Sequence, residues 1–251
     1  MLFYGHSTDT FKDAVGMLIE ETLECEDIDC ISGRPFYLDY ENADTLYSCV
    51  LPLEEAVKNL REMMNCPVGI TDISMADGEF VLEIKNSLDT PNIVRRYYPF
   101  GHYVLCRRGE NKIYINDPDG FPLLPYPVSA LPALQPVIIR TGNSRDIRID
   151  IDTVINRIRR QVSEHLGTCP DREPDRIFLR YAVGNYVCQI NKISEFLCRY
   201  ANAPENILSR IKQILSQLAF PLPVSTDKVY QADKEIYCLL EEILCSRTCK
   251  Q

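Results

Sequence analysis

Basic residues are scarce in this 251-residue chain. Lys and Arg number 27 against 36 Asp and Glu, which gives a net charge of −9. Phosphate contacts need clustered Lys and Arg, so the composition argues against a nucleic-acid partner. The most basic run, residues 147–160, spaces its arginines at helical intervals and mixes them with aspartates. We interpret it as a solvated helix face, and docking of an acidic partner at Arg157, Arg159 and Arg160 is the alternative.

Long apolar runs are also missing. No stretch approaches the roughly 20 uninterrupted apolar residues that a membrane span requires. Residues 1–9 lack a basic region followed by a long apolar run, so we expect no signal peptide and a cytoplasmic protein. The 11 cysteines have no framework spacing, and Cys238, Cys245 and Cys249 lack both a CxxC and a nearby histidine. We therefore expect reduced thiols, no metal site and no cofactor.

The distribution of prolines and apolar residues predicts two domains. The proline-rich stretch 117–136 excludes a regular helix, because proline lacks a backbone donor and clashes with the preceding turn. Strand-like runs and two amphipathic helices precede it, and residues 137–149 would close the sheet. Helical spacing dominates the chain that follows. We predict an α+β domain over residues 1–147 and a helical domain or cap over residues 148–251.

Several segments carry an apolar stripe at helical spacing. The first helix buries Phe11, Val15, Leu18 and Ile19, with Ser7, Thr8 and Asp9 as candidate N-caps and Asp13 near the positive end of the helix dipole. A second helix over residues 52–65 turns Leu53, Ala56, Leu60 and Met63 inward. Residues 24–30, ECEDIDC, are expected to form an acidic loop. In the C-terminal part the predicted helices cover residues 151–166, 176–202, 204–220 and 226–247.

Residues 101–117 have the pattern of a β-hairpin. Centring its turn on Gly109 and Glu110 pairs Leu105 with Tyr114 and places His102 directly opposite Asp117. Such neighbours have Cβ atoms about 4.5–5.5 Å apart, so the pattern predicts a His–Asp contact. An aspartate there would orient the imidazole and stabilise its protonated form, as in a catalytic triad. The alternative is a polar contact on an exposed sheet face.

The chain contains only three histidines, and we weigh each one separately. His165 lies near the end of a predicted helix and is most simply a C-terminal cation or a partly buried side chain. His6 adjoins the first helix as a turn residue that would line a site. Only His102 has an orienting carboxylate at hairpin spacing, so it is the candidate general base.

Residues 5–18, GHSTDTFKDAVGML, together with GHYVLC and IYINDPDG, resemble the N-terminal family of butirosin biosynthesis protein H. This is a papain-like group, related to the C39 peptidases, and the resemblance covers about residues 5–130. It implies a papain-like fold in which a helix packs on an antiparallel sheet. It also implies a nucleophile at position 7, a base at His102, an orienting group at Asp117, and substrate-binding positions at His6, Phe36, Tyr37 and Tyr103.

The activity implied by this resemblance is acyl transfer in natural-product biosynthesis. An acyl group would pass from the thioester of an acyl carrier protein to residue 7 and then to a small-molecule amine, forming an amide. A cysteine peptidase or thioesterase of the same fold is one alternative, and a catalytically inactive binding homologue is another. The resemblance names no cofactor, and a homodimer is compatible with it.

Position 7 departs from the family pattern, which has cysteine where this chain has serine. Three interpretations stay open. Ser7 is an engineered replacement of a catalytic cysteine, a natural serine nucleophile supported by the His–Asp pair, or the mark of an inactive homologue. Cys25 and Cys30 do not replace it, because neighbouring carboxylates disfavour the reactive thiolate. Cys106 is expected to fill the core.

Overall fold

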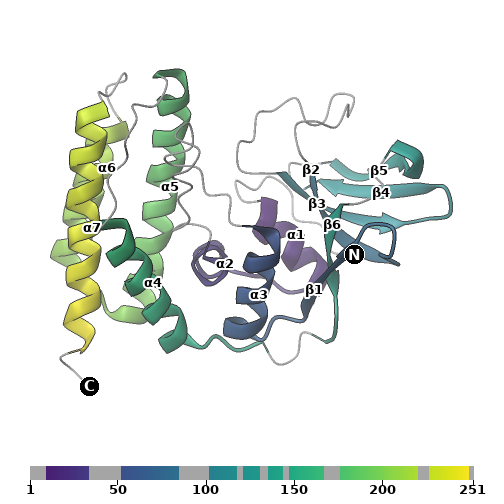
Figure 1. The fold of residues 1–251 in the computed structure, drawn as a ribbon, viewed down its shortest axis with the longest axis horizontal. Helices are drawn as coiled ribbons and strands as arrows, with labels where there is room; N and C mark the ends of the chain where they lie inside the picture. Colours follow the sequence, from purple (N-terminus) through teal and green to yellow (C-terminus); the bar gives the residue numbers. More distant parts are fainter. Residues whose placement is uncertain are drawn as a thin grey trace. The chain divides into compact units, whose positions relative to one another are not determined.

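The structure of the protein, a computed structural model, describes residues 10–33, 52–84, 102–117, 121–130, 135–143, 147–166, 176–219 and 226–248. These residues divide into two compact units. The first holds the described residues up to Ser32 and from Pro52 to Ile149, and the second holds Gly33 and the described residues from Asp150 onward. The first unit combines three helices with a six-stranded sheet, and the second contains four helices (Figure 1). The protein therefore belongs to the α+β class.

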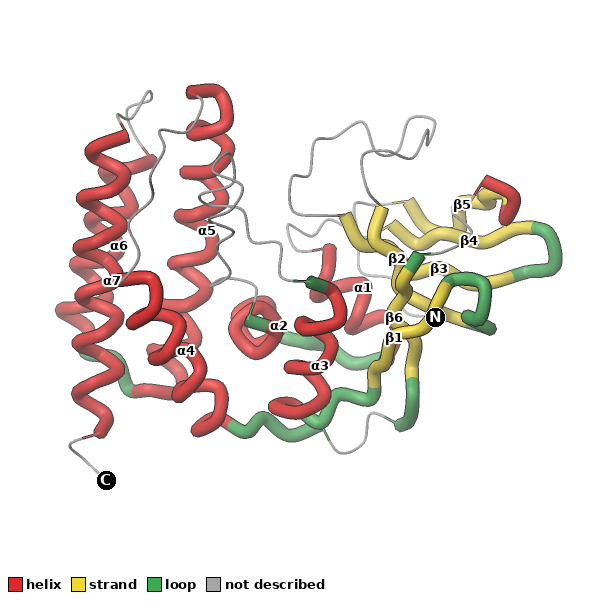
Figure 2. The backbone as a smooth tube through the Cα atoms, in the orientation of Figure 1, coloured by secondary structure: helices red, strands yellow, loops and turns green. Residues whose placement is uncertain are grey.

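All strand pairs of the sheet are antiparallel, and the strand order is β1-β6-β2-β3-β4-β5. The start of the segment that we expected to close the sheet joins it as the last strand in sequence, which lies between β1 and β2. Figure 2 shows the strands in yellow and the helices in red. The strands are β1 (Val68–Asp72), β2 (Glu79–Ile84), β3 (His102–Arg108), β4 (Lys112–Asp117), β5 (Phe121–Pro127) and β6 (Pro136–Arg140).

Helix α1 (Thr10–Ile19) packs on β3 and is buried along its whole length apart from Lys12. The four predicted core residues, Phe11, Val15, Leu18 and Ile19, are all at most 1% exposed. The ring of Phe11 meets that of Tyr103 edge to face, with centroids 4.9 Å apart. The spacing predicted burial of one face of this helix, whereas the structure buries α1 on every side. Helix α1 is therefore the central helix of the first unit.

Helix α2 (Cys25–Ser32) occupies the segment for which we expected an acidic loop. Its acidic residues Glu26 and Asp27 stand in the first turn, where carboxylates favour helix formation by opposing the positive end of the dipole. The Nδ2 group of Asn59 donates a 2.8 Å hydrogen bond to the carbonyl of Ser32, the last residue of α2. This bond satisfies one of the carbonyls that a helix end leaves without a partner.

Helix α3 (Leu53–Met64) confirms the second predicted helix. Leu53, Ala56 and Leu60 are buried as expected, whereas Met64 rather than Met63 fills the last inward position. Asn65 ends the helix in the left-handed conformation, with a φ of 50°. Asparagine tolerates that conformation better than most residues.

The two faces of the sheet are covered differently. Side chains alternate between faces along a strand, so Tyr103 and Leu105 face α1 while Val104 and Cys106 face the opposite side. On that opposite side a buried apolar cluster spans the sheet, with Leu124 and Tyr126 partly covering it. Its members are Ile73, Ala76, Phe80, Leu82, Val104, Cys106, Ile113, Ile115 and Val137.

Strand β5 forms one edge of the sheet, from within the stretch where the prolines exclude a helix. Its register with β4 shifts between Ile115 and Asp117, and Leu123 adopts a φ of 56°. Pro125 and Pro127 have no N–H groups to offer to a further strand. Proline in a strand is largely confined to such edges, where it blocks pairing with other chains.

The second unit contains the helices expected beyond residue 150. They are α4 (Ile151–Leu166), α5 (Arg176–Ala201), α6 (Glu205–Ala219) and α7 (Thr226–Thr248). No helix in the described ranges is both long enough and apolar enough to span a membrane.

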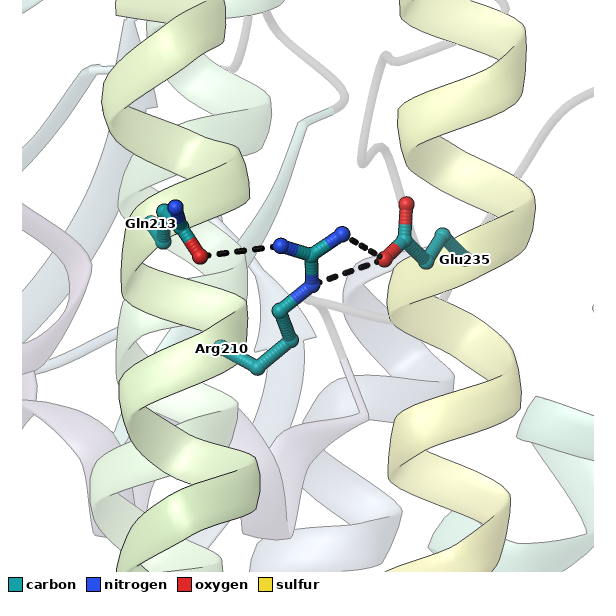
Figure 3. A network of polar contacts seen from close by, with 3 residues as sticks. All are labelled: Arg210, Gln213 and Glu235. Atoms are coloured by element: carbon teal, nitrogen blue, oxygen red, sulfur yellow. Dashed lines mark hydrogen bonds and ion pairs between the residues drawn. The ribbon is translucent and has the colours of Figure 1, made fainter.

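Helix α7 packs against α4, α5 and α6 and takes part in polar contacts with α4 and α6. Between α4 and α7, His165 Nε2 lies 2.6 Å from Asp233 Oδ2, and the imidazole stacks on Tyr237. Arg210 of α6 lies 2.6 Å from Glu235 of α7 and donates a 2.9 Å hydrogen bond to Gln213 of its own helix (Figure 3). The first pair is largely buried, and both members of the second are almost half exposed.

Candidate functional site

A hydrogen bond joins the first residue of α1 to the start of β3. The backbone N–H of Tyr103 donates to Oγ1 of Thr10 over 3.1 Å, and both residues are buried. The last paired residues of β3 and β4 in this direction are Leu105 and Asn116. The threonine hydroxyl therefore accepts from the strand just beyond its pairing with β4, and the starts of α1 and β3 lie together near the end of β4.

Three of the positions at which the sequence predicted a site, His102, Tyr103 and Asp117, have a described backbone near this junction. His102 is the first residue of β3, next to Tyr103, and Asp117 is the last residue of β4. Tyr103 is 5% exposed and packs on Phe11, so its side chain belongs to the core beneath the helix. Ser7, His6, Phe36 and Tyr37 lie outside the described residues, as do the side chains of His102 and Asp117.

The predicted hairpin register is wrong by two residues. Leu105 pairs with Asn116 instead of Tyr114, and Arg107 pairs with Tyr114 instead of Lys112. The backbone N–H of Gly109 donates to the carbonyl of Lys112 over 2.8 Å, so the turn is centred on residues 110–111. Moving the centre of a turn by one residue moves every cross-strand partner by two. Continuing this register aligns Asp117 with Val104, so His102 does not stand directly opposite Asp117. On the other side of β3, His102 pairs with Ile84 of β2.

Gly109 lies next to the turn and has a different role from the one that the sequence-based register assigned to it. A Cβ at this position would lie 3.1 Å from the carbonyl oxygen of Lys112 and 3.3 Å from Cε2 of Tyr114. The glycine is needed where the Tyr114 ring packs onto the backbone, and not at the turn centre where we had placed it. A sequence-based register relies on glycine marking the turn centre, and here that assumption fails.

Asn116 is a buried polar residue that the sequence reasoning missed. It is 1% exposed and lies across from Leu105, which places it on the face of the sheet that α1 covers. Its Oδ1 accepts a 2.8 Å hydrogen bond from the N–H of Leu123. The available signal was the alternation in residues 113–116, where an asparagine stands at a position on a covered face.

Asp13 is a buried carboxylate in the first turn of α1. Its Oδ1 lies 2.9 Å from Nζ of Lys12, and its Oδ2 is buried with no hydrogen-bond partner among the described residues. The positive end of the helix dipole favours a negative charge in this turn, as we expected from the sequence. Asp13 therefore adds negative charge one turn from Thr10.

The described cysteines of the first unit are unsuited to nucleophilic chemistry. Cys66 and Cys106 are at most 3% exposed. Burial raises the pKa of the Cys66 thiol to about 12 and the pKa of the Cys106 thiol further, because an apolar surrounding disfavours the thiolate. Cys30 is also fully buried. A thiol that stays protonated is a poor nucleophile.

The three arginines of residues 157–160 differ in exposure and in the contacts they make. Arg157 is 8% exposed, and Arg159 donates to the carbonyl of Leu244 and to Asn156. Of these three arginines only Arg160 is well exposed, and it lies 3.7 Å from Glu164 on the same helix. Docking of an acidic partner at this helix stays a prediction. Among the residues that the structure describes, no three His, Cys, Asp or Glu side chains are grouped to hold a metal ion.

Comparisons with known proteins found no matching family model, no similar curated protein and no similar solved structure.

Proposed function

We propose that the first unit is an acyltransferase of papain-like architecture that forms amides in a biosynthetic pathway. The hydrogen bond between Tyr103 and Thr10 is the observation that carries this proposal, because it holds the start of α1 against the start of β3. Papain-like catalysis needs a nucleophile before a helix and a histidine on a neighbouring strand. Position 7 precedes α1 by three residues, and His102 begins β3.

The reaction uses residue 7 as an acyl-carrying nucleophile. Its side-chain oxygen attacks the carbonyl carbon of a thioester, and its proton passes to His102. The C–S bond breaks, and the departing thiolate takes that proton. An amine then attacks the acyl group on residue 7, its proton passes through His102 to the residue 7 oxygen, and an amide is released.

The site needs no cofactor for these steps. The positive end of the α1 dipole and the free N–H groups of its first turn favour the oxyanion that forms on the acyl carbon. Asp13 opposes this effect with a negative charge in the same turn. The same carboxylate would favour a cationic acceptor, such as an ammonium group, near the start of the helix.

The observed register changes which group would orient His102. Asp117 is the carboxylate that the sequence predicted, but the two-residue shift removes the direct pairing that supported it. Asp119 is two residues further along the same acidic stretch. Replacing each by asparagine therefore tests the role: the orienting residue should lower the acylation rate about 10³–10⁴-fold, and the other residue should lower it little.

The decisive experiment compares the native chain with a Ser7→Cys variant. Each is incubated with an acyl N-acetylcysteamine thioester, a small donor, and its intact mass is measured. A mass increase by one acyl group on the native chain supports the proposal with Ser7 as the nucleophile. An increase on the Ser7→Cys variant alone supports an acyltransferase site whose cysteine has been replaced, and His102→Ala should abolish acylation in either background. Adding an amine should then restore the original mass and yield the amide.

The other functions predict different outcomes of the same experiment. Loss of the acyl group to water, with no amide formed from any amine supplied, indicates a thioesterase or peptidase. If neither the native chain nor the Ser7→Cys variant is acylated while both are folded, the acyltransferase proposal fails. The serine at position 7, where the family pattern has cysteine, favours an inactive binding homologue in that case.

A further inference from the structure

One part of the sheet exposes large apolar side chains. Tyr114 of β4 is 40% exposed and Leu123 of β5 is 58% exposed. Tyr114 stands in a cross-strand row between Arg107 of β3 and Pro125 of β5. Leu105, two residues before Arg107 on the same face, is fully buried, so the cover of this face ends between them. We call the group Arg107, Lys112, Tyr114, Leu123 and Pro125 the β4–β5 face.

Both apolar residues of this face are held in place by the structure beneath them. The Tyr114 ring lies on Gly109, where a Cβ would come within 3.3 Å of it. Leu123 has a φ of 56°, which costs roughly 1–2 kcal/mol for a residue with a Cβ. Its N–H is bound by the buried Oδ1 of Asn116. This strain secures no core packing for Leu123, and strain of this kind is concentrated at functional sites.

Two exposed cations accompany these apolar residues. Arg107 is the cross-strand neighbour of Tyr114, and Lys112 lies two residues before it on the same face of β4. Within the described ranges neither makes an ion pair. The acidic groups nearby are Glu79, opposite Arg107 on β2, and Glu110 in the turn. Arg108 points elsewhere, because it donates to the carbonyl of Ile73.

The prolines of the edge strand β5 limit how a partner can bind to the sheet. Pro125 and Pro127 have no N–H, so β5 cannot pair fully with an added strand. A partner must therefore bind through side chains, with an apolar residue against Tyr114 and Leu123 and carboxylates near Arg107 and Lys112. Of the three large apolar side chains that are exposed among the described residues, two lie on this face, and the third is Met75.

We propose that the β4–β5 face docks an acidic carrier protein that brings the acyl group as a thioester. This inference rests on the proposed acyltransferase function. Arg107 lies five residues from His102 along β3, about 17 Å at roughly 3.4 Å per residue. A donor docked there reaches the start of α1 only through a long flexible arm, which is how a carrier protein holds its acyl group.

The test compares two donors and two charge-reversed variants in the Ser7→Cys background. Arg107→Glu with Lys112→Glu alters the β4–β5 face, whereas Lys58→Glu with Arg61→Glu makes the same charge change on the exposed side of α3. The donors are the acyl N-acetylcysteamine thioester and acylated carrier proteins. The carriers are all acyl and peptidyl carrier proteins of the source organism. Each is purified in its holo form and is then acylated to serve as a donor.

The expected result is a loss specific to the carrier donor. Reversal at Arg107 and Lys112 should lower acylation from the carrier at least about tenfold and leave acylation from the small thioester within about twofold. The α3 variant should leave both rates near those of the parent protein. Leu123→Gly, which suits the positive φ and removes only the side chain, should also weaken use of the carrier.

Binding is measured separately, so that failure of docking and failure of catalysis are distinguished. Each labelled holo carrier is titrated with the native chain and with both variants at low and moderate salt. Binding without acylation by either donor would retain the docking surface and reject the proposed function. Equal use of the carrier by both charge-reversed variants, or no binding of any carrier, would overturn the docking proposal.

Discussion

The backbone N–H of Tyr103 donates to the hydroxyl of Thr10, and this 3.1 Å bond joins residues 93 positions apart in the sequence. Strand β3 has no pairing with β4 beyond Leu105 and Asn116, so the threonine supplies an acceptor there. A buried N–H without an acceptor would be costly. The bond therefore determines where α1 begins relative to the sheet.

Replacing Thr10 by valine tests this junction. Valine has nearly the same shape but no hydroxyl, so the buried N–H of Tyr103 loses this acceptor. We expect the free energy of unfolding to fall by about 1–3 kcal/mol, measured by urea denaturation. Thr10→Ser keeps the oxygen and should retain most of the stability. A loss in Thr10→Ser with none in Thr10→Val would show that the methyl group, rather than the hydrogen bond, stabilises the junction.

Asn116 and Leu123 form a second testable pair. Asn116→Leu removes the acceptor for the N–H of Leu123 and should destabilise the protein by about 1–3 kcal/mol in urea denaturation. Leu123→Gly suits a φ of 56° and removes a mostly exposed side chain, so stability should be unchanged or higher by up to about 1 kcal/mol. A clear loss on Leu123→Gly would contradict the strain assigned to Leu123.

The buried thiols of Cys66 and Cys106 should make the protein less stable in alkali. Burial raises the pKa of the folded Cys66 thiol to about 12, whereas an unfolded thiol ionises near 8.5. Above pH 8.5 the unfolded state therefore binds fewer protons than the folded state, and the free energy of unfolding falls as pH rises. Each thiol contributes up to about 1.4 kcal/mol per pH unit in this range.

Urea denaturation between pH 7.5 and pH 10.5, a range of roughly three units around the thiol pKa, measures this dependence. Cys66→Ala and Cys106→Ala should each make the alkaline slope shallower, although each lowers stability at neutral pH by leaving a cavity. Tyr and Lys also titrate in this range, so the difference between parent and variant is the informative quantity. An unchanged slope in both variants would rule out the buried thiols as its cause.

Two polar side-chain pairs that join α7 to neighbouring helices, His165 with Asp233 and Arg210 with Glu235, should differ in strength. His165 and Asp233 have side chains 12% and 14% exposed, whereas those of Arg210 and Glu235 are 48% and 45% exposed. Double-mutant cycles to alanine should give a coupling energy of about 1.5–3 kcal/mol for His165 and Asp233. For the exposed pair it should be at most about 1 kcal/mol and should shrink in high salt. Equal coupling energies would contradict this ranking.

Local sequence patterns were sufficient to predict most helices. Apolar spacing predicted α1, α3 and all four helices beyond residue 150, because an amphipathic stripe of this period has a single way to bury itself. The pattern was insufficient for α2, where a short acidic helix depends on Asn59 of α3 to complete its end. It was also insufficient for the order of the strands, since β6 enters the middle of the sheet.

The candidate site likewise combines features that the sequence predicts with features that only the structure shows. The sequence by itself determined the helix at residue 10, the strands that begin at His102 and end at Asp117, and the helical second unit. Only the tertiary structure decided the register, because a turn can move by one residue without changing which face each side chain occupies. Packing of the Tyr114 ring on Gly109 decides between the two turns, and that contact is formed only when the strands pair.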